Sequence, residues 1–432
     1  MNSYHLVGIA GVGMNPLAQL LRAAGHAVSG SDRYADQGAE LEVLAKLRRA
    51  GICIHPQDGS GVRPGTTAVV VSTAIEKDNP DLAAAARLSI PVAHRATVLA
   101  GLANDHDCIA IAGTSGKTTV TGMTGYLLEQ LGADPTVVNG GAVINWIDGD
   151  RVGNVRAGAG PLWVVEADES DRSFLAFHPD WAIITNISAD HFDLAETARL
   201  FDQFRANVRR AIIDGGILGP WRDLAVKLAG SGATFEYRGV PFTLNVPGRH
   251  NAENALQAVM LCERLGYGLD EISRVLAGFR GIERRLQKVG AGRVAVYDDY
   301  AHNPAKISAA LRTLKPIYPK LHCVWRPHGF GPLRQMCDDL AAMFAREMRS
   351  CDRLHLLPVY YAGGTATQDV TSDMLAEKLR PSGLDVRVVA DFSALESTIA
   401  ADAAAGEAVV LMGARDPELP RSARRLAARL CG

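Results

Sequence analysis

The feature that most constrains the fold is a buried strand that runs through a glycine-rich turn directly into a helix. Residues 107–112 (DCIAIA) are apolar enough for a buried strand, and the turn 113–119 (GTSGKTT) leads into a helix that ends near Leu131. Parallel α/β sheets are built from this strand–turn–helix unit. The pattern therefore predicts a parallel sheet with helices packed on its faces.

The same alternation of strand and helix recurs in three stretches of the 432-residue chain. A domain takes about 100–200 residues, so a chain of this length is expected to form two or three domains. We predict an α/β protein of three domains: residues 1–100, 101–285 and 286–432. The predicted strands are 4–9, 26–29, 66–72, 107–112, 161–165, 181–185, 293–297, 321–325, 353–357, 385–389 and 407–412, and the predicted helices include 81–87 and 247–266.

Composition excludes several function classes. Hydrophobic residues make up 47% of the chain and charged residues 21%, which excludes a disordered or collagen-like protein. A formal net charge of −2 provides no basic surface for nucleic acid or an anionic membrane. The seven cysteines are widely spaced and form no CxxC motif, which favours reduced thiols. Because we find neither a leader pattern nor an apolar run of roughly 20 residues, we expect a cytoplasmic protein without a membrane partner.

The turn at 113–119 is the strongest chemical signal in the sequence. Backbone N–H groups of such a turn, together with the N-terminus of the next helix, bind phosphate oxygens. Lys117 would reach the β- and γ-phosphates of a nucleotide, and the Thr118 hydroxyl would hold Mg²⁺. The turn is a shortened variant, because Ile111 stands where the pattern GxxxxGK[ST] has its first glycine. The predicted phosphate-binding residues here are Gly113, Thr114, Ser115, Gly116, Lys117, Thr118 and Thr119.

An acidic segment follows the predicted strand at 161–165. Glu166 begins this segment (EADESD), and a carboxylate at the end of a strand beside a phosphate loop is suited to bind Mg²⁺. His191 follows the next predicted strand in the same way. Taken alone, each signal fits a solvated loop or an ordinary histidine better than a metal site, so the interpretation depends on their combination.

A second glycine-rich turn lies near the N-terminus. Gly8, Gly11 and Gly13, with Asp32 at the end of the second predicted strand, indicate a site for the pyrophosphate of a nucleotide. Ala10 occupies the second glycine position of the dinucleotide-binding pattern. A nicotinamide cofactor and a simple tight turn therefore stay as alternatives at this site.

Polar residues follow three predicted strands of the third domain. Residues 298–304 (DDYAHNP), 326–328 (RPH) and 413–416 (GARD) each come directly after an apolar run. The carboxyl ends of parallel strands form the edge at which such sheets bind ligands. Three polar segments at one edge therefore predict a binding face.

Together these motifs resemble the Mur ligase family of cell-wall synthesis, over nearly the whole chain. Within the family the chain is most similar to the branch that adds L-alanine. Other branches carry a carbamylated lysine after the metal-site histidine, whereas here no lysine occurs between Lys117 and Lys227. The resemblance rests on residues 8–14, 29–32, 71–75, 78–80, 113–119, 166–171, 185–191, 248–251, 284–285 and 298–304.

The resemblance implies a Rossmann-like N-terminal domain for a UDP-sugar, a P-loop-type central ATPase domain and a Rossmann-like C-terminal domain that closes over the site. It implies that ATP and Mg²⁺ are used to join UDP-N-acetylmuramate to L-alanine through an acyl phosphate, in peptidoglycan precursor synthesis. Lys117, Glu166 and His191 would be the catalytic residues. Thr118 would bind the metal together with Glu166 and His191. By the same resemblance, the nucleotide is ATP, and its binding residues would be those of the turn 113–119 together with Asn251, Asn254, Arg285 and Asp298. The substrate-binding residues would be Gly8, Gly11, Gly13, Asp32, Ser72, His302, Asn303, Arg326 and His328.

The chain departs from the alanine-adding branch at several positions. Asn303 stands where that branch typically has a second histidine, and Gly329 and Phe330 stand where it has arginine and tyrosine. These positions lie where the family receives the amino acid. Ser115 replaces a typical histidine, and the stretch 191–248 is shorter than in that branch.

Alternatives to alanine ligation therefore stay open. One alternative is a recycling ligase, which attaches a whole tripeptide to the same UDP-sugar. Another is a related ligase that uses a different amine. A catalytically silent regulator that binds a UDP-sugar or ATP is the alternative of a different class. A dehydrogenase is the least favoured, because it would not need the phosphate loop. The sequence does not indicate an oligomeric state.

Overall fold

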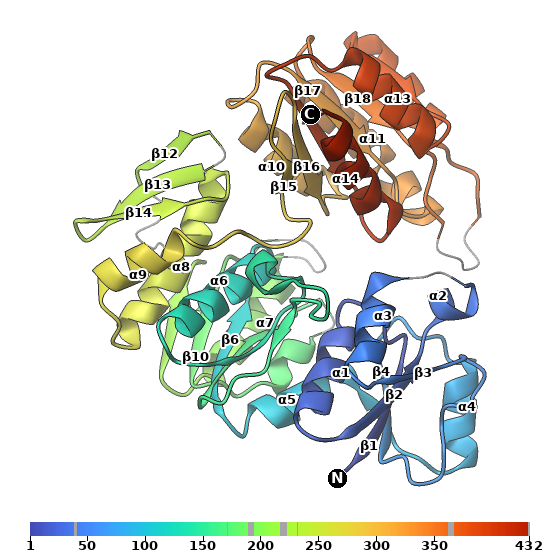
Figure 1. Ribbon diagram of the computed structural model, residues 1–432, viewed down its shortest axis with the longest axis vertical. Coiled ribbons are helices and arrows are strands. Elements are labelled where there is room, and N and C mark those ends of the chain that lie inside the picture. The colour runs from blue at the N-terminus through green and yellow to red at the C-terminus, as the bar shows by residue number, and fades with distance from the viewer. Residues whose placement is uncertain are drawn as a thin grey trace. The chain divides into compact units, whose positions relative to one another are not determined.

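The structure is a computed structural model of the chain (Figure 1), and it describes residues 1–38, 41–170, 172–188, 194–216, 223–230, 232–361 and 367–430. The chain forms two compact units. The first contains Met1–Val226, Phe235–Leu244 and His250–Ile282. The second contains Lys227–Thr234, Asn245–Arg249 and Glu283–Gly432. Within the described ranges, no helix is both long enough and apolar enough to cross a membrane.

The first unit begins with a five-stranded parallel sheet of order β3-β2-β1-β4-β5. Its strands are β1 (Ser3–Val7), β2 (Ala27–Ser31), β3 (Cys53–His55), β4 (Ala68–Val71) and β5 (Val92–His94). The helices are α1 (Met14–Ala23), α2 (Arg33–Asp36), α3 (Glu42–Arg49), α4 (Pro80–Arg87) and α5 (Arg95–Ala103).

The central strand β1 is buried on both faces of the sheet, as expected for a doubly wound sheet. Alternate residues of a strand point to opposite faces. Leu6 accordingly belongs to the apolar cluster formed with α1, α3 and α5, whereas Val7 belongs to the cluster formed with α4. The strands predicted at 4–9, 26–29 and 66–72 are confirmed. The edge strands β3 and β5 were not predicted, because three partly exposed residues do not make an apolar run.

A six-stranded sheet of order β11-β10-β6-β9-β7-β8 follows in the first unit. Its strands are β6 (Asp107–Ala112), β7 (Thr136–Val138), β8 (Val155–Arg156), β9 (Leu162–Glu166), β10 (Trp181–Ile184) and β11 (Ala211–Asp214). Every neighbouring pair is parallel except β7 and β8. Its helical segments are α6 (Lys117–Gln130), α7 (Leu194–Ala206) and the short 3-10 helices Ile144–Trp146 and Ser173–Ala176.

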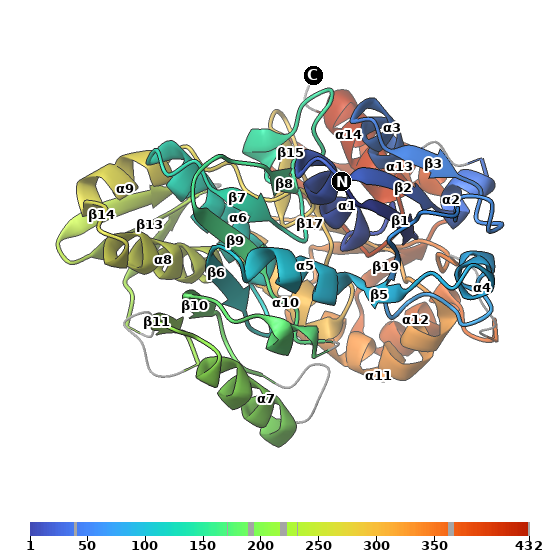
Figure 2. The same ribbon diagram turned by 90° about the horizontal axis from the view of Figure 1, so that it is seen from below.

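A small three-stranded sheet has the order β12-β13-β14. Its strands are β12 (Val226–Ala229), β13 (Gly232–Tyr237) and β14 (Val240–Leu244), and the helices α8 (Arg249–Arg264) and α9 (Leu269–Leu276) come next in the chain. Arg238 and Gly239 both have positive φ, which makes the two-residue turn between β13 and β14 a type I′ turn. Helix α9 lies against β14 (Figure 2). The helix predicted at 247–266 is confirmed by α8.

The second unit contains a six-stranded sheet of order β15-β16-β20-β17-β18-β19. Its strands are β15 (Gln287–Gly290), β16 (Ala295–Asp299), β17 (Leu321–Trp325), β18 (Arg353–Leu356), β19 (Asp385–Val388) and β20 (Ala408–Met412). Only β15 runs antiparallel to its neighbour. The helices are α10 (Pro304–Leu314), α11 (Phe330–Glu347), α12 (Ser372–Leu379), the 3-10 helix Arg380–Ser382, α13 (Phe392–Asp402) and α14 (Glu418–Leu430).

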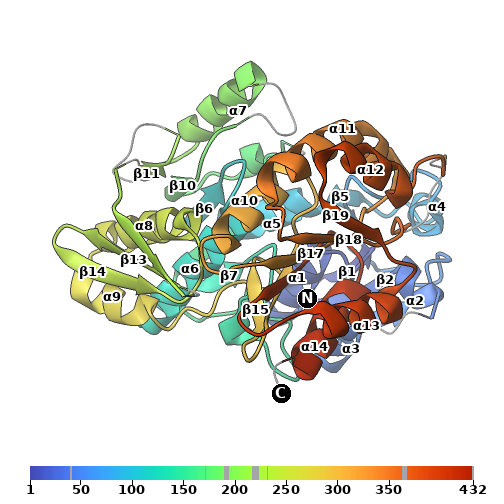
Figure 3. The same ribbon diagram turned by 90° about the horizontal axis from the view of Figure 1, so that it is seen from above.

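Helices cover both faces of this second-unit sheet (Figure 3). Tyr297 points into the apolar cluster with α10, α11 and α12, and its neighbour Val296 points into the cluster with α13 and α14. The predicted strand at 293–297 is displaced to Ala295–Asp299. The reason is that Asp298 and Asp299 continue the parallel pairing with Leu411 and Met412 of β20.

The strand order brings the chemically marked segments together within each unit. Strand β6 lies between β10 and β9, so the phosphate loop after β6 and Glu166 at the end of β9 share one edge. In the second unit β20 lies between β16 and β17, so the polar segments after these three strands share one edge. The expected α/β fold is confirmed, and these predicted ligand-binding segments lie at the carboxyl ends of parallel strands.

We expect His355 of β18 to contribute to the pH dependence of the free energy of unfolding. This histidine is fully buried and stacks on His322 with 5.8 Å between ring centroids; neither of its ring nitrogens has a hydrogen-bond partner among the described residues. Burial, with help from His322 and Arg387, lowers the pKa of His355 from 6.5 to about 4. The unfolded chain therefore binds this proton first, and stability falls as the pH drops from 6.5 towards 4, by about 3 kcal/mol in total.

The variant His355→Phe should remove this contribution. Urea denaturation at several pH values should show a stability profile that is flatter between pH 6.5 and 4 than in the wild type. The exposed His178 provides the control, because His178→Gln should leave the profile unchanged. An unaltered slope in His355→Phe would contradict the assignment.

Candidate active site

The phosphate loop has a backbone that only glycine adopts without strain at two positions. Gly113 has φ +131° and Gly116 has φ +89°, and helix α6 begins at the next residue, Lys117. A Cβ on Gly113 would lie 2.0 Å from Thr185 Oγ1, and a Cβ on Gly116 would lie 2.7 Å from Asn254 Oδ1. The loop therefore combines the tight turn and the helix N-terminus that phosphate binding requires.

The variant Gly113→Ala is expected to destabilise the protein by about 3 kcal/mol, since the added methyl group clashes with Thr185. Gly132 is the matched control. It also has positive φ (+84°), but apart from its own chain neighbours no atom of the described residues lies within 4 Å of where its Cβ would be. Gly132→Ala should therefore cost only about 1 kcal/mol of backbone strain. Chemical denaturation of both variants measures the difference, and equal losses would contradict the steric explanation.

Segment 185–188, which follows β10, holds the loop from the side. Ser115 N–H donates to Asn186 Oδ1 at 3.1 Å, and Thr185 Oγ1 donates to the carbonyl of Ser115 at 2.6 Å. The Thr114 hydroxyl donates to the carbonyl of Ser188 at 3.2 Å. The loop conformation is thus supported by side chains of the neighbouring strand end, and not by the loop sequence alone.

Lys117 is held by two carboxylates at the start of α6. Its Nζ donates to Glu169 Oε2 at 2.6 Å and to the carbonyl of Gly113 at 2.8 Å, and Asp168 Oδ1 lies 3.7 Å away. Burial disfavours the lysine charge, but Glu169, Asp168 and Glu166 more than compensate, so the pKa of Lys117 is raised. The ammonium group is therefore charged and positioned inside the loop.

Glu166 is fixed by two donors from different segments. The Thr118 hydroxyl donates to its Oε1 at 3.0 Å, and Gly140 N–H donates to its Oε2 at 2.7 Å. A Cβ on Gly140 would lie 2.7 Å from the same carboxylate oxygen, so glycine here lets the carboxylate approach the backbone closely. The predicted metal-binding pair Thr118 and Glu166 is therefore brought together.

These two oxygen donors suit Mg²⁺, which commonly uses one or two carboxylates and keeps several water ligands. His191, the third predicted metal ligand, lies outside the described residues. Within the described part of the chain, no group of three or more His, Cys, Asp or Glu side chains is arranged to hold a metal ion. The role of Mg²⁺ here thus stays a prediction that rests on Thr118 and Glu166.

The predicted adenine-side residues Asn251 and Asn254 lie in the first turns of α8. Both side chains are buried, and Asn254 Nδ2 donates to Asn251 Oδ1 at 3.5 Å. The close approach of Asn254 Oδ1 to Gly116 places this pair against the phosphate loop. The other two predicted ATP-binding residues, Arg285 and Asp298, belong to the second unit.

The N-terminal glycine turn is organised by Asp32, the residue after β2. Ala10 N–H donates to Asp32 Oδ2 at 2.8 Å, and Tyr34 N–H donates to Oδ1 at 3.0 Å. Burial raises the pKa of this carboxyl, and the two N–H groups oppose the rise. The predicted residues Gly8, Gly11 and Gly13 all lie in this turn between β1 and α1. Asp32 therefore shapes the turn, and contact with a substrate stays a prediction.

Ser72 follows β4, the strand next to β1, and thus lies at the same edge as the glycine turn. Its carbonyl accepts the N–H of Ile75 at 3.2 Å. A Cβ on Gly8 would lie 3.3 Å from the Ile75 side chain, so this second turn packs against the first.

Asp298 lies at the predicted binding edge of the second unit, next to Arg284. The Arg284 Nε is 3.2 Å from Asp298 Oδ2, and Arg284 Nη2 donates to the carbonyl of Gly413 at 2.6 Å. Burial raises the pKa of Asp298 to about 6, against the effect of Arg284. Arg285 lies over the ring of Tyr300 with its guanidinium carbon 5.5 Å from the ring centroid.

The remaining predicted residues of this edge also lie together. The rings of His302 and His328 meet edge to face, with centroids 4.8 Å apart. Burial, together with His302, Arg415 and Lys306, lowers the pKa of His328 to about 4, so its imidazole is neutral at pH 7.

Arg326 and Asn303 already have partners within the second unit. Arg326 pairs with Asp416 at 2.9 Å. The Asn303 side chain accepts the N–H of Lys306 at 3.0 Å and thereby caps α10. A helix cap explains an asparagine at this position.

Several residues of the site were not singled out from the sequence. Asp168 and Glu169 lie in the acidic segment, but the pattern did not show that they face Lys117. Gly140 and Asn186 follow β7 and β10 and contact Glu166 and the phosphate loop, respectively. The one local signal for them is the pair of glycines at 140–141 after a short apolar run.

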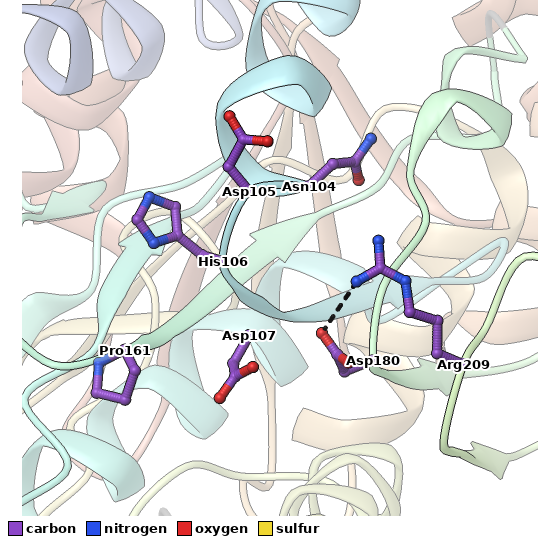
Figure 4. Close-up of a pocket in the computed structure, with 7 residues that line it drawn as sticks. All are labelled: Asn104, Asp105, His106, Asp107, Pro161, Asp180 and Arg209. Atoms are coloured by element: carbon purple, nitrogen blue, oxygen red, sulfur yellow. Dashed lines mark ion pairs between the residues drawn. The ribbon is translucent and has the colours of Figure 1, made fainter.

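A pocket of about 330 Å³ lies at the amino ends of strands β6, β9 and β10, opposite the ends that carry the phosphate loop and Glu166 (Figure 4). Asp107 is the first residue of β6, and Pro161 and Asp180 directly precede β9 and β10. Arg209 pairs with Asp180 at 3.7 Å. The other lining residues are Asn104, Asp105 and His106. This pocket is therefore separate from the phosphate loop.

The fold, and the sheet edge that carries Lys117 and Glu166, define a class: an α/β protein with a lysine-bearing phosphate loop and an adjacent carboxylate. Three family models match the chain: "Mur ligase family, catalytic domain" over residues 3–107, "Mur ligase middle domain" over 111–202 and "Mur ligase, glutamate ligase domain" over 284–415. The chain belongs to the Mur ligase family, and it is an ATP-dependent amide-forming ligase.

The similarity to individual proteins extends over almost the whole chain. A UDP-N-acetylmuramate–L-alanine ligase from Rhizobium meliloti (strain 1021) is 36% identical, across 95% of this chain and 93% of the relative. The structure of UDP-N-acetylmuramate-alanine ligase from Thermotoga maritima matches with a TM-score of 0.81 and 26% identity, over 99% of both chains. A murein peptide ligase from Psychrobacter arcticus shares the fold, with a TM-score of 0.64 and 22% identity over 100% of this chain and 99% of that one.

Proposed function

We propose that this ligase joins UDP-N-acetylmuramate to L-alanine, using ATP, in the synthesis of peptidoglycan precursors. The observation that carries the proposal is the 36% identity, over 95% of the chain, to a ligase with this pair of substrates. The arrangement of Lys117, Thr118 and Glu166 supports it, because these side chains converge beside a phosphate-binding turn.

The first chemical step activates a carboxylate, which is a poor electrophile. The lactyl carboxylate attacks the γ-phosphorus of ATP, so a carbon–oxygen–phosphorus linkage forms while the bond to ADP breaks. The Lys117 ammonium offsets the negative charge on the transferred group, and the N–H groups of the loop orient it. Mg²⁺ held by Thr118 and Glu166 would supply further charge neutralisation to the phosphates.

The second step forms the amide. The amine attacks the acyl carbon, phosphate leaves, and one proton is lost from the nitrogen. The protein contributes mainly by holding the reactants in position. We propose that the binding edge with His302, Arg326 and His328 receives the amine, as the family resemblance implies.

A tripeptide or another amine is the second candidate, because of the residues at this edge. Asn303 caps α10. Gly329 has φ +93°, and apart from its chain neighbours only Pro332, among the described residues, lies within 4 Å of where its Cβ would be. A position without a side chain leaves space that a larger amine would use.

Phosphate release from ATP tests these assignments. With UDP-N-acetylmuramate present, L-alanine should stimulate release well above the rate without an amine. Stimulation by the tripeptide alone would favour the second candidate. If no amine stimulates release, the ligase is not acting on this UDP-sugar.

A further inference from the structure

Within the first unit, a series of hydrogen bonds through side-chain and backbone amides connects the N-terminal glycine turn to Glu166. We call it the amide series. It begins at Asn15 in the first turn of α1. Asn15 Nδ2 donates to the carbonyl of Gly11 at 3.0 Å and to that of Ala10 at 3.4 Å. The side chain of Asn15 is 4% exposed. This amide therefore holds the turn that we propose as part of the UDP-sugar site.

The next hydrogen bond joins two residues that are 139 positions apart in the sequence. Asn154 Nδ2 donates to Asn15 Oδ1 at 2.7 Å, and Asn154 is also 4% exposed. Gln19 Nε2 donates to both Asn15 Oδ1, at 3.2 Å, and Asn154 Oδ1, at 3.0 Å. Three side-chain amides thus satisfy one another where α1 meets the residue before β8. Because buried amides without partners are costly, this arrangement is held in one geometry.

The last links reach the phosphate loop through the turn after β7. Asn139 N–H donates to the carbonyl of Asn154 at 2.9 Å, and Asn139 Nδ2 donates to the carbonyl of Gly141 at 2.9 Å. The intervening Gly140 N–H donates to Glu166 Oε2 at 2.7 Å. Glu166 in turn accepts the Thr118 hydroxyl. The series therefore ends at the two side chains proposed to bind Mg²⁺.

From this series we infer that Asn154 is a positioning residue that couples the UDP-sugar turn to the Glu166 carboxylate. When the UDP-sugar orders the glycine turn, it also fixes the position of Asn15. Asn154 then restrains the turn at 139–141, which orients Glu166. The nucleotide and the UDP-sugar then bind more tightly together than separately, and by thermodynamic reciprocity each strengthens the other by the same factor. The inference rests on the proposed function, because it takes the two turns as the sites of these substrates.

A second set of contacts joins helix α3 to the loop before Asn154 and reaches neither turn. Arg49 Nε donates to Asp150 Oδ1 at 3.0 Å, and Arg49 Nη2 donates to the carbonyl of Gly149 at 2.6 Å. The Arg49 side chain is about half exposed. Arg49→Ala therefore removes a contact between α3 and the loop before Asn154 while leaving the amide series intact, and it is the matched control.

The test measures binding by calorimetry, with UDP-N-acetylmuramate as the ligand, in the absence and presence of Mg²⁺ and a non-hydrolysable ATP analogue. In the wild type the analogue should tighten UDP-sugar binding by about tenfold. In Asn154→Ala and in the isosteric Asn154→Asp, which cannot donate to Asn15, this factor should fall to about one. The affinity for each ligand alone should change much less, and Arg49→Ala should keep the full factor.

Hydrogen exchange of the unmodified protein provides a second readout that needs no variant. UDP-N-acetylmuramate alone should slow exchange of the backbone amides at 139–141. Undiminished coupling in both Asn154 variants, or unchanged exchange at 139–141, overturns the inference. Absence of UDP-sugar binding to the wild type overturns the proposed function as well, whereas binding without coupling overturns the inference alone.

Discussion

The variant Lys117→Ala should release phosphate from ATP about 10³-fold more slowly than the wild type. The reason is that Lys117 is the charged group held inside the phosphate loop, with Nζ 2.8 Å from the carbonyl of Gly113. Without it, the negative charge that develops during phosphoryl transfer is not compensated. Steady-state phosphate release in the presence of UDP-N-acetylmuramate and L-alanine measures this effect.

Two controls separate this loss from unfolding. Lys117→Ala leaves the buried Glu169 without its ion-pair partner, so thermal unfolding has to be measured alongside activity. Lys117→Met keeps most of the volume and should show the same loss of rate. Lys378→Ala removes an exposed lysine of α12 and should be as active as the wild type. Retained turnover in a folded Lys117 variant would show that the ATP site lies elsewhere.

The variant Glu166→Gln should lower the rate of phosphate release by roughly 10²- to 10³-fold and raise the Mg²⁺ concentration needed for half-maximal rate. Glutamine keeps the shape of the side chain and still accepts the N–H of Gly140, but it lacks the negative charge that attracts the metal ion. A Mg²⁺ titration of phosphate release measures both effects.

Binding of the ATP analogue gives an independent readout for Glu166. Its Mg²⁺-dependent affinity should weaken in Glu166→Gln, and its affinity without Mg²⁺ should hold. Glu263→Gln is the control, because Glu263 pairs with Arg238 and Tyr237 in a contact apart from the loop. If Glu166→Gln has the Mg²⁺ dependence of the wild type, Glu166 is not a metal ligand.

The strands that carry the site could be predicted because each is an apolar run followed by a distinctive turn. Residues 107–112 are entirely apolar after Asp107, and the buried strand β6 occupies these positions. Some short or half-exposed strands were not predicted. Strands β3, β5 and β8 have two or three residues, and so few residues do not establish a period that the sequence reveals.

The partners within the site were harder to predict than its members. Lys117 begins a helix after a glycine-rich turn and Glu166 ends a strand, so both are recognisable by local pattern. The contact of Lys117 with Glu169 depends instead on how the loop after β9 turns back. The amide series from Asn15 to Glu166 has no local signal at all. Asn15 and Asn154 are 139 positions apart, and isolated asparagines are common in turns.

The sequence by itself determined the α/β class, the positions of the phosphate loop and the glycine turn, and the resemblance to Mur ligases. These properties depend on short-range patterns of apolar residues, glycines and charges, which local chain geometry converts into strands and turns. Only the tertiary structure decided that Thr118 and Gly140 both donate to Glu166 and that Asn154 joins α1 to the turn after β7. Those contacts depend on the order of strands in the sheet and on the packing of helices against it, which bring distant residues within hydrogen-bond distance.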